Sequence, residues 1–193
     1  MRKYLLIIVI LSSLLLTAES LQSDEEGASV IKLRSDCRNL SVSQVYAMAS
    51  ISLRKKDEWG FYGHSTIKHS YEMRSENGID VVVDHATGLM WIRSGSDNYM
   101  KWHEAAELVK NLNKMKYAGH SDWRLPTLDE AVSLLEPSKS NALYIDPVFD
   151  GEQWGIWSCD KHVSGEAWSV YFSLGNVRWR YKNRYVRPVR SLN

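Results

Sequence analysis

Apolar and polar positions follow a helical period in the segment after residue 40. Ser41 and Gln44 form a capping-box pattern, and the apolar side chains behind them recur at helical spacing. We therefore expect a helix over 42–55. The stretch 59–73 is rich in glycine, histidine and tyrosine and has no clean period. We expect a loop with short extended pieces there.

A hairpin and two further helices are predicted next. The runs 79–83 and 89–92 are β-branched or apolar and are separated by turn residues, which predicts two antiparallel strands. Apolar side chains then recur at i, i+3, i+4 and i+7 over 100–115, which predicts an amphipathic helix. A second capping box at Thr127 predicts another helix, and Pro137 ends it because proline cannot continue a helix.

The last part of the chain predicts strands. Short apolar or alternating runs give four strand candidates, which are 154–158, 167–172, 177–182 and 185–190. A hairpin followed by two helices and a run of strands favours an α+β fold with a short-stranded antiparallel sheet.

The composition excludes several classes of protein. With 44% hydrophobic and 24% charged residues, 11 glycines and 4 prolines, the chain is not collagen-like, coiled-coil or wholly disordered. Its 193 residues correspond to one domain with an extension. The net charge is +1, so bulk charge indicates no partner. Eight tryptophans and ten tyrosines supply rings that either fill a core or stack on flat or sugar-like ligands.

The first residues have the pattern of a secretory signal peptide. A short basic segment precedes an apolar run over 4–16, and Ala18 and Ser20 are the small residues of a cleavage site. The run is shorter than the roughly 20 residues that a membrane-spanning helix needs. We expect a signal peptide over 1–20, a mobile linker over 21–36, and a secreted or periplasmic protein with no membrane span after cleavage. A retained anchor is the alternative.

The chain has two cysteines, Cys37 and Cys159. In an exported protein an even count permits one disulfide, which would join the N-terminal extension to the C-terminal sheet. Two unpaired thiols are the alternative. The sequence contains no Cys-x-x-Cys pair and no metal-ligand spacing of cysteines, so neither cysteine is expected to be catalytic.

The sequence contains no motif of a known catalytic or metal site. His103-Glu104 is not followed by the second histidine of a zinc protease, and there is no glycine-rich phosphate loop. We expect a protein that is not an enzyme and has no catalytic residue, metal or cofactor. A calcium site around Asp146, Asp150 and Glu152 is a minor alternative.

Positive charge is concentrated near the C-terminus. Arg178, Arg180 and Lys182 alternate with apolar residues, so a strand over 177–182 would place the three cations on one face. No acidic residue follows Glu166. Arginine binds sulfate or carboxylate through a bidentate fork, and a neighbouring ring can stack on a ligand.

We therefore predict that Arg178, Arg180 and Lys182 bind an anionic ligand. The alternative is a solvated strand face whose charges prevent edge-to-edge aggregation. The secretion signal disfavours nucleic acid as the partner.

Several segments together resemble the Lcl C-terminal domain family, a bacterial family named for the C-terminal domain of a collagen-like adhesin. The matching segments are 83–91 (VDHATGLMW), 117–130 (YAGHSDWRLPTLDE), 156–158, 167–172 and 185–190 (YVRPVR). Their order and spacing cover about 73–193, which we assign to the domain. Residues 37–72 would then form an N-terminal helical extension. The resemblance implies a variant of the C-type lectin fold that is distantly similar to formylglycine-generating enzymes.

The resemblance also implies a function. The adhesin of this family binds sulfated glycosaminoglycans as an oligomer, which implies an anionic polysaccharide or a cell-surface protein as partner and a homo-oligomer as assembly. The chain lacks the calcium-ligand motifs of sugar-binding C-type lectins and the close cysteine pair of formylglycine-generating enzymes. We therefore expect a non-enzymatic binding domain. A structural component of the cell envelope and an enzyme related to formylglycine-generating enzymes are the alternatives.

The shared segments also have structural roles. Asp84 and Thr87-Gly88 are expected to make the hairpin turn. Trp91 and Trp123 are expected to be core residues, because they lie beside the hairpin and the helix that begins at Thr127.

Overall fold

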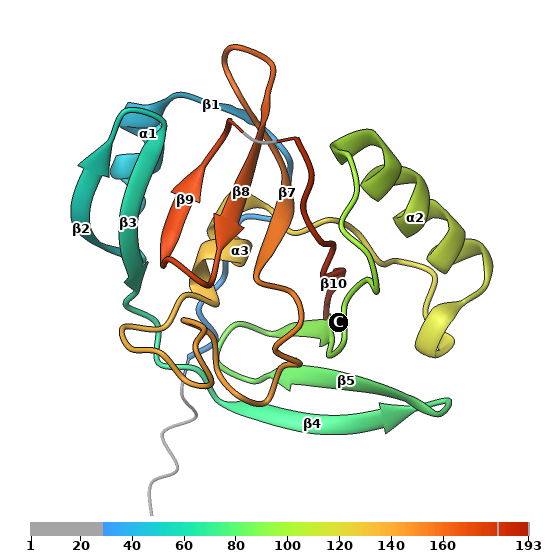
Figure 1. Cartoon of the computed structure of the whole chain (residues 1–193). Coiled ribbons are helices and arrows are strands. Elements are labelled where there is room, and N and C mark those ends of the chain that lie inside the picture. Colours follow the sequence, from blue (N-terminus) through green and yellow to red (C-terminus); the bar gives the residue numbers. More distant parts are fainter. Residues whose placement is uncertain (1–28, 181, 193) are drawn as a thin grey trace, which may run out of the picture.

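The computed structural model describes residues 29–180 and 182–192 (Figure 1). The predicted signal peptide and the first part of the predicted linker lie outside the described residues. Within them, two β-sheets and three α-helices form an α+β fold. No helix in these two ranges is long and apolar enough to cross a membrane.

The larger sheet has six strands in the order β1-β7-β8-β9-β3-β2. Its strands are β1 (Asn39–Leu40), β2 (Ile51–Asp57), β3 (Gly60–Ser65), β7 (Gly155–His162), β8 (Ala167–Tyr171) and β9 (Asn176–Arg178). Strand β1 pairs with β7 in parallel, and the other pairs are antiparallel.

The smaller sheet has four antiparallel strands in the order β10-β6-β5-β4. These strands are β4 (Tyr71–Glu76), β5 (Ile79–Asp84), β6 (Leu89–Ile92) and β10 (Val189–Ser191). The sequence predicted a single sheet, and this was wrong. The last strand pairs with β6, with Val189 opposite Trp91, instead of continuing the run of strands that precedes it.

The helices are α1 (Val42–Tyr46), α2 (Trp102–Lys114) and α3 (Leu128–Ser133). Helix α2 lies on the opposite side of the molecule from β2, and α3 lies behind the six-stranded sheet (Figure 1). Both α2 and α3 confirm the predicted helices. The capping box of α3 is complete, because Thr127 Oγ1 accepts the Glu130 N–H and Glu130 Oε2 accepts the Thr127 N–H at 2.8 Å.

The predicted hairpin is also confirmed, as β5 and β6. Asp84 holds its turn, because its carboxylate accepts hydrogen bonds from the Thr87 hydroxyl and the Ala86 N–H. Gly88 adopts a φ of +66°, which glycine tolerates without strain. Trp91 and Trp123 are core residues as predicted, with 0% and 2% of their surface exposed.

The predicted helix over 42–55 is wrong beyond Tyr46. Its capping box is present, since the Ser41 hydroxyl accepts the Gln44 N–H, but α1 ends within two turns. Residues 51–57 instead form β2 and pair with β3. The predicted helical extension over 37–72 thus contributes strands to the same sheet as β7, β8 and β9.

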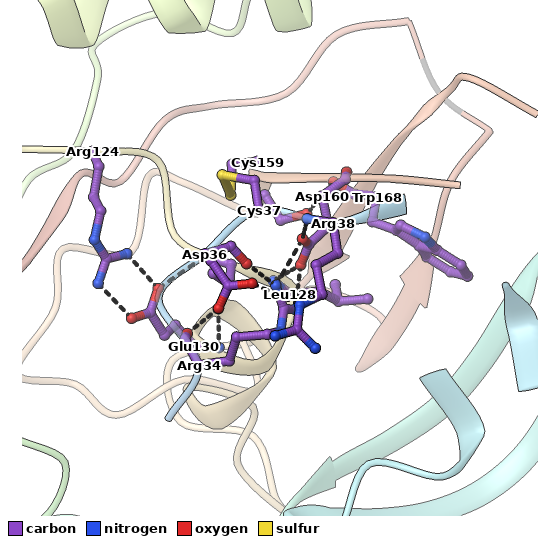
Figure 2. The surroundings of a disulfide bond; sticks show 12 residues. Arg34, Asp36, Cys37, Arg38, Arg124, Leu128, Glu130, Cys159, Asp160 and Trp168 are labelled. Atoms are coloured by element: carbon purple, nitrogen blue, oxygen red, sulfur yellow. Dashed lines mark hydrogen bonds and ion pairs between the residues drawn. A yellow bond between two sulfur atoms is a disulfide. The ribbon is translucent and has the colours of Figure 1, made fainter. Parts of the chain in front are cut away.

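The N-terminal segment is fastened to the domain by a disulfide between Cys37 and Cys159, which confirms the predicted pairing (Figure 2). Next to it, the fully buried Asp160 carboxylate accepts the Leu128 N–H at 2.6 Å and both Nη groups of Arg34, at 2.9 and 2.6 Å. Leu128 opens α3, so the carboxylate also lies at the positive end of that helix. Residues 33–40 therefore pack on the domain.

Candidate anion-binding site

The three predicted ligand residues do not lie on one strand. Strand β9 ends at Arg178, so the strand predicted over 177–182 is wrong beyond that residue. Trp179 turns into the core, where its ring is 8% exposed and stacks on His162 with the ring centroids 4.2 Å apart. A buried Trp179 agrees with the apolar face that the sequence predicted, but the alternation of cations is lost because the strand stops at Arg178.

Arg178 reaches across β3 to a carboxylate. Its Nη2 donates hydrogen bonds to Asp57 on β2 and to the hydroxyl of Tyr62 on β3, the latter at 2.9 Å. Gly60 lies between the two charged residues, opposite Asp57 on one side and Arg178 on the other. The charge of Arg178 is therefore compensated inside the sheet.

Arg180 and Lys182 are exposed, and within the described residues neither forms an ion pair. The Arg180 guanidinium stands 4.6 Å from the ring centroid of Trp59. Lys182 lines a hollow of about 190 Å³ together with Lys161, Trp102 and other residues. Lys161 Nζ is 4.3 Å from the ring centroid of Trp102. Two lysines, the indoles of Trp102 and Trp157 and the acidic Glu166 thus line this hollow, which we call the Trp102 hollow.

Two later arginines have structural partners. Arg187 is fully buried and donates to the carbonyl oxygens of Ile92 and Asp150, both at 3.1 Å, and to Gln153 Oε1 at 2.8 Å. Burial lowers the pKa of Arg187 to about 9, although the nearby Asp150 charge opposes this shift. Arg190 Nε donates to Asp122 Oδ1 at 2.8 Å. Neither side chain is available to a ligand.

A second electropositive depression lies at the β2 edge of the larger sheet, and we call it the Tyr144 groove. It has a volume of about 390 Å³ and is lined by Arg54, Lys55, Tyr62, Tyr144 and Leu174. The pairing register shifts between Leu53 and Lys55, so Arg54 is the extra residue of a β-bulge. The bulge lets two adjacent cations line the same groove.

The rings of the Tyr144 groove carry cations above them. The Arg54 guanidinium lies 5.1 Å from the Tyr144 ring centroid, and Lys139 Nζ lies 5.3 Å from the same centroid. Arg178 lies 5.5 Å from the centroid of Tyr62. Within about 6 Å such pairs attract one another, which holds the charged groups over the tyrosines.

Acidic groups are absent from the described lining of the Tyr144 groove. Within the described part of the chain, Arg54, Lys55 and Lys139 form no ion pair, whereas Arg178 is paired with Asp57. The three cations are exposed and project around an aromatic floor. The groove thus offers bidentate and point-charge donors to an anion, and the tyrosine rings hold these donors in place.

Sequence reasoning missed the Tyr144 groove for a local reason. Arg54 and Lys55 lie at the end of the predicted helix over 42–55, where two cations indicate only a helix terminus. Tyr144 and Lys139 lie in the loop between α3 and β7, which has no repeating pattern. No short motif joins these segments, because they meet only after the β2–β3 hairpin has folded.

The described residues contain no cluster of side chains suited to a metal ion. No group of three or more His, Cys, Asp and Glu side chains there could hold a metal ion. Of the residues considered for calcium, Asp146 accepts the Val148 N–H at 2.8 Å, and Asp150 pairs with Arg93 at 2.8 Å. Their carboxylates are engaged in holding the local backbone and an arginine.

Comparison with known proteins identifies the family of this fold. The model of the Lcl C-terminal domain matches residues 80–190, which run from β5 into β10. Neither the curated proteins nor the solved structures contain a significant match to the chain. The match includes the hairpin turn, the complete capping box of α3 and the buried Arg187 described above. Because it spans more than half of the sequence, the chain belongs to the Lcl C-terminal domain family.

Proposed function

We propose that this protein is a secreted or periplasmic, non-enzymatic module that binds an anionic, sulfated glycan on a cell surface. The observation that carries the proposal is the Tyr144 groove, in which Arg54, Lys55 and Lys139 surround a tyrosine floor without a carboxylate in its described lining. We further propose that the domain is a variant of the C-type lectin fold and acts as a homo-oligomer. Its α+β architecture is compatible with the proposed fold.

The chemistry of a sulfated sugar matches the groove. Sulfate and carboxylate groups accept paired hydrogen bonds from arginine and attract the lysine ammonium groups. The apolar face of a sugar ring can contact the half-buried tyrosines beside these cations. A neutral sugar would gain only this apolar contact, so affinity should depend on the anionic groups.

The predicted residues extend this surface across the larger sheet. Trp157 lies opposite Ser169, and Ser169 lies opposite Arg178, so the Trp102 hollow and the Tyr62 ring occupy the same face. The hollow involves β7 and β8, and the Tyr144 groove involves β2 and β3. Four strand spacings separate β7 from β2, or about 20 Å. A linear polyanion could contact Lys182 at one end and Arg54 at the other.

A heparin-binding experiment tests the proposal. The first variant, Arg54→Gln/Lys55→Gln/Lys139→Gln, removes the charges of the Tyr144 groove. The second, Arg180→Gln/Lys182→Gln, removes two predicted ligand residues and leaves the Asp57–Arg178 pair intact. A control variant, Lys68→Gln/Lys110→Gln/Lys114→Gln, removes three exposed charges elsewhere. Each protein is measured with heparin and with desulfated heparin at two salt concentrations.

We expect the groove variant to bind heparin about tenfold more weakly than wild type, because exposed charge pairs contribute roughly 0.2–1 kcal/mol each. The control variant should bind like wild type, and desulfated heparin should bind weakly to all four proteins. Higher salt should weaken heparin binding, since charges are screened over about 8–10 Å. Wild-type affinity in both the groove and the Arg180/Lys182 variants, with circular dichroism unchanged, would exclude this glycan site.

One observation favours the alternative of a structural envelope component. Trp179, which lies between Arg178 and Arg180 in the sequence, is buried against His162 and Trp168 and presents no ring to a ligand. If wild-type protein binds neither heparin nor desulfated heparin at low salt, a structural role in the cell envelope is favoured over glycan binding.

A further inference from the structure

A hollow that neither the cationic residues nor the Tyr144 groove touches lies between α2 and the loop after β6. Its volume is about 310 Å³, at the lower end of the range for small-molecule sites. One side is apolar and consists mainly of Ile92 from β6, Leu108 and Leu112 from α2, and Tyr117. The other side is the polar loop 94–98.

The polar wall of this hollow is held in place from behind. Ser96 N donates to the Val186 carbonyl at 2.7 Å, and Ser96 Oγ accepts the Val186 N–H at 3.0 Å. Gln153 Nε2 donates to the Ser96 carbonyl at 3.1 Å. Gly95 has a φ of +66°, and a Cβ there would lie 2.8 Å from the Val186 carbonyl oxygen. The wall is therefore formed before any ligand arrives, which reduces the ordering cost of binding.

The charge of the hollow is negative, unlike that of the Tyr144 groove. Asp97 is the charged residue among those that line it, and it forms no ion pair with any other described residue. Ser94 and Asn98 are further polar residues beside Asp97 in this wall. A ligand with an apolar body and an ammonium group would suit both walls. Its apolar body would be buried against Leu108 and Leu112, and its ammonium group would pair with Asp97.

We propose that this hollow binds a small organic cation, an amine whose apolar body lies on Ile92, Leu108 and Leu112 and whose ammonium group faces Asp97. The hollow would then bind a cation, whereas the Tyr144 groove would bind an anion. The amine site is independent of the proposed glycan function, because none of its lining residues also lines the Tyr144 groove or the Trp102 hollow.

Three indole probes of nearly equal size test the charge preference. Tryptamine is a cation at neutral pH, 3-ethylindole is neutral and indole-3-propionate is an anion. Binding to the full mature chain is followed by NMR titration, with the methyl signals of Ile92, Leu108 and Leu112 as reporters. We expect tryptamine to shift these signals and to bind about tenfold more tightly than indole-3-propionate, because the carboxylate attracts one probe and repels the other.

Two variants separate the charged wall from the apolar wall. Asp97→Asn should weaken tryptamine binding about fivefold and leave 3-ethylindole unchanged, since only the ion pair is lost. Leu108→Gln, at a half-buried position on α2, should weaken all three probes. Glu107→Gln removes an exposed acid of the same helix outside the hollow and should change nothing.

The proposal is overturned if the three probes bind alike, if Asp97→Asn leaves tryptamine affinity unchanged, or if tryptamine shifts signals elsewhere and not those of the three reporter methyls. Heparin binding of Asp97→Asn, measured in parallel, should equal that of wild type. Failure of the amine site therefore leaves the glycan proposal standing, and failure of the glycan proposal leaves the amine site standing.

Discussion

His69 is held between two hydrogen-bond acceptors: its Nδ1 lies 2.7 Å from Asp84 Oδ2, and its Nε2 lies 2.7 Å from the carbonyl oxygen of Ser133. Both ring nitrogens must donate, so the buried ring is an imidazolium. Burial opposes this charge, but the hydrogen bond and charge of Asp84 and the Ser133 carbonyl outweigh it and raise the pKa of His69. The pair ties the start of β4 to the hairpin turn and to the end of α3.

This pair predicts a pH dependence of stability. Because the folded pKa of His69 lies above the unfolded value of about 6.5, its contribution is complete below that pH and is lost as the pH rises through the folded pKa. The pKa of Asp84 is lowered by His69 and Thr87 against the effect of burial, so its contribution is lost only as the pH falls through that lowered value. Wild-type stability should therefore decline above about pH 6.5.

Urea unfolding between pH 5 and about 9 measures this decline. His69→Gln should lower the free energy of unfolding by roughly 3–5 kcal/mol at pH 5, as expected when one partner of a buried ion pair is removed. It should also flatten the pH profile. His103→Gln, at an exposed position on α2, is the control and should keep the wild-type profile. Parallel profiles for wild type and His69→Gln would show that the ring is neutral in the folded state.

Gly60→Ala is expected to be strongly destabilising. A Cβ at Gly60 would lie 1.7 Å from the Val177 carbonyl oxygen, and the backbone there has a φ of +151°. Relieving this overlap requires β3 and β9 to separate, which would also part Asp57 from Arg178. We expect a loss of about 3 kcal/mol or more in the free energy of unfolding. Gly151→Ala is the matched control, because its Cβ would meet only Leu143 at 3.8 Å; equal effects of the two substitutions would contradict the packing described.

Removal of the disulfide should destabilise the protein without changing its fold. The bridge links residues 122 positions apart, and chain entropy assigns to such a loop roughly 4–5 kcal/mol. The Arg34–Asp160 contacts persist without it, so Cys37→Ser/Cys159→Ser should still give the native circular dichroism spectrum. Thermal unfolding with and without reductant checks this. A reductant that leaves the wild-type melting temperature unchanged would mean that the bridge adds nothing.

Truncation of the two core indoles should be costly. Trp91→Ala and Trp123→Ala should each lower the free energy of unfolding by roughly 3–5 kcal/mol, the usual range for a buried large aromatic residue. Trp123 also donates its Nε1–H to the Tyr117 carbonyl at 2.8 Å, which Ala cannot replace. Tyr99→Ala serves as the control, because Tyr99 is 56% exposed, and should cost under about 1 kcal/mol. A similar small cost at Trp91 would place its ring at the surface.

Some elements of this protein are determined by the sequence within a few positions of each residue. The capping box of Thr127 and Glu130 starts α3, and Asp84 turns β5 into β6 through its own neighbours. The disulfide partners could also be predicted, because a chain with two cysteines has only one possible intramolecular pairing. In the capping box and the hairpin turn the interacting groups are close in sequence. For the disulfide, two cysteines allow only one pairing.

Tertiary structure decided the conformation of residues 51–57 and the position of the Tyr144 groove, which depends on them. Their apolar positions fit a helix locally, but pairing with β3 supplies backbone hydrogen bonds and burial that outweigh a weak local preference. That pairing brings Arg54 to Tyr144 and sets Asp57 opposite Gly60, within reach of Arg178. More than 80 residues separate Arg54 from Tyr144 and Asp57 from Arg178, so no periodicity or motif contains either contact. The charges could be counted in the sequence, but only the sheet decides which of them are neutralised and which face a ligand.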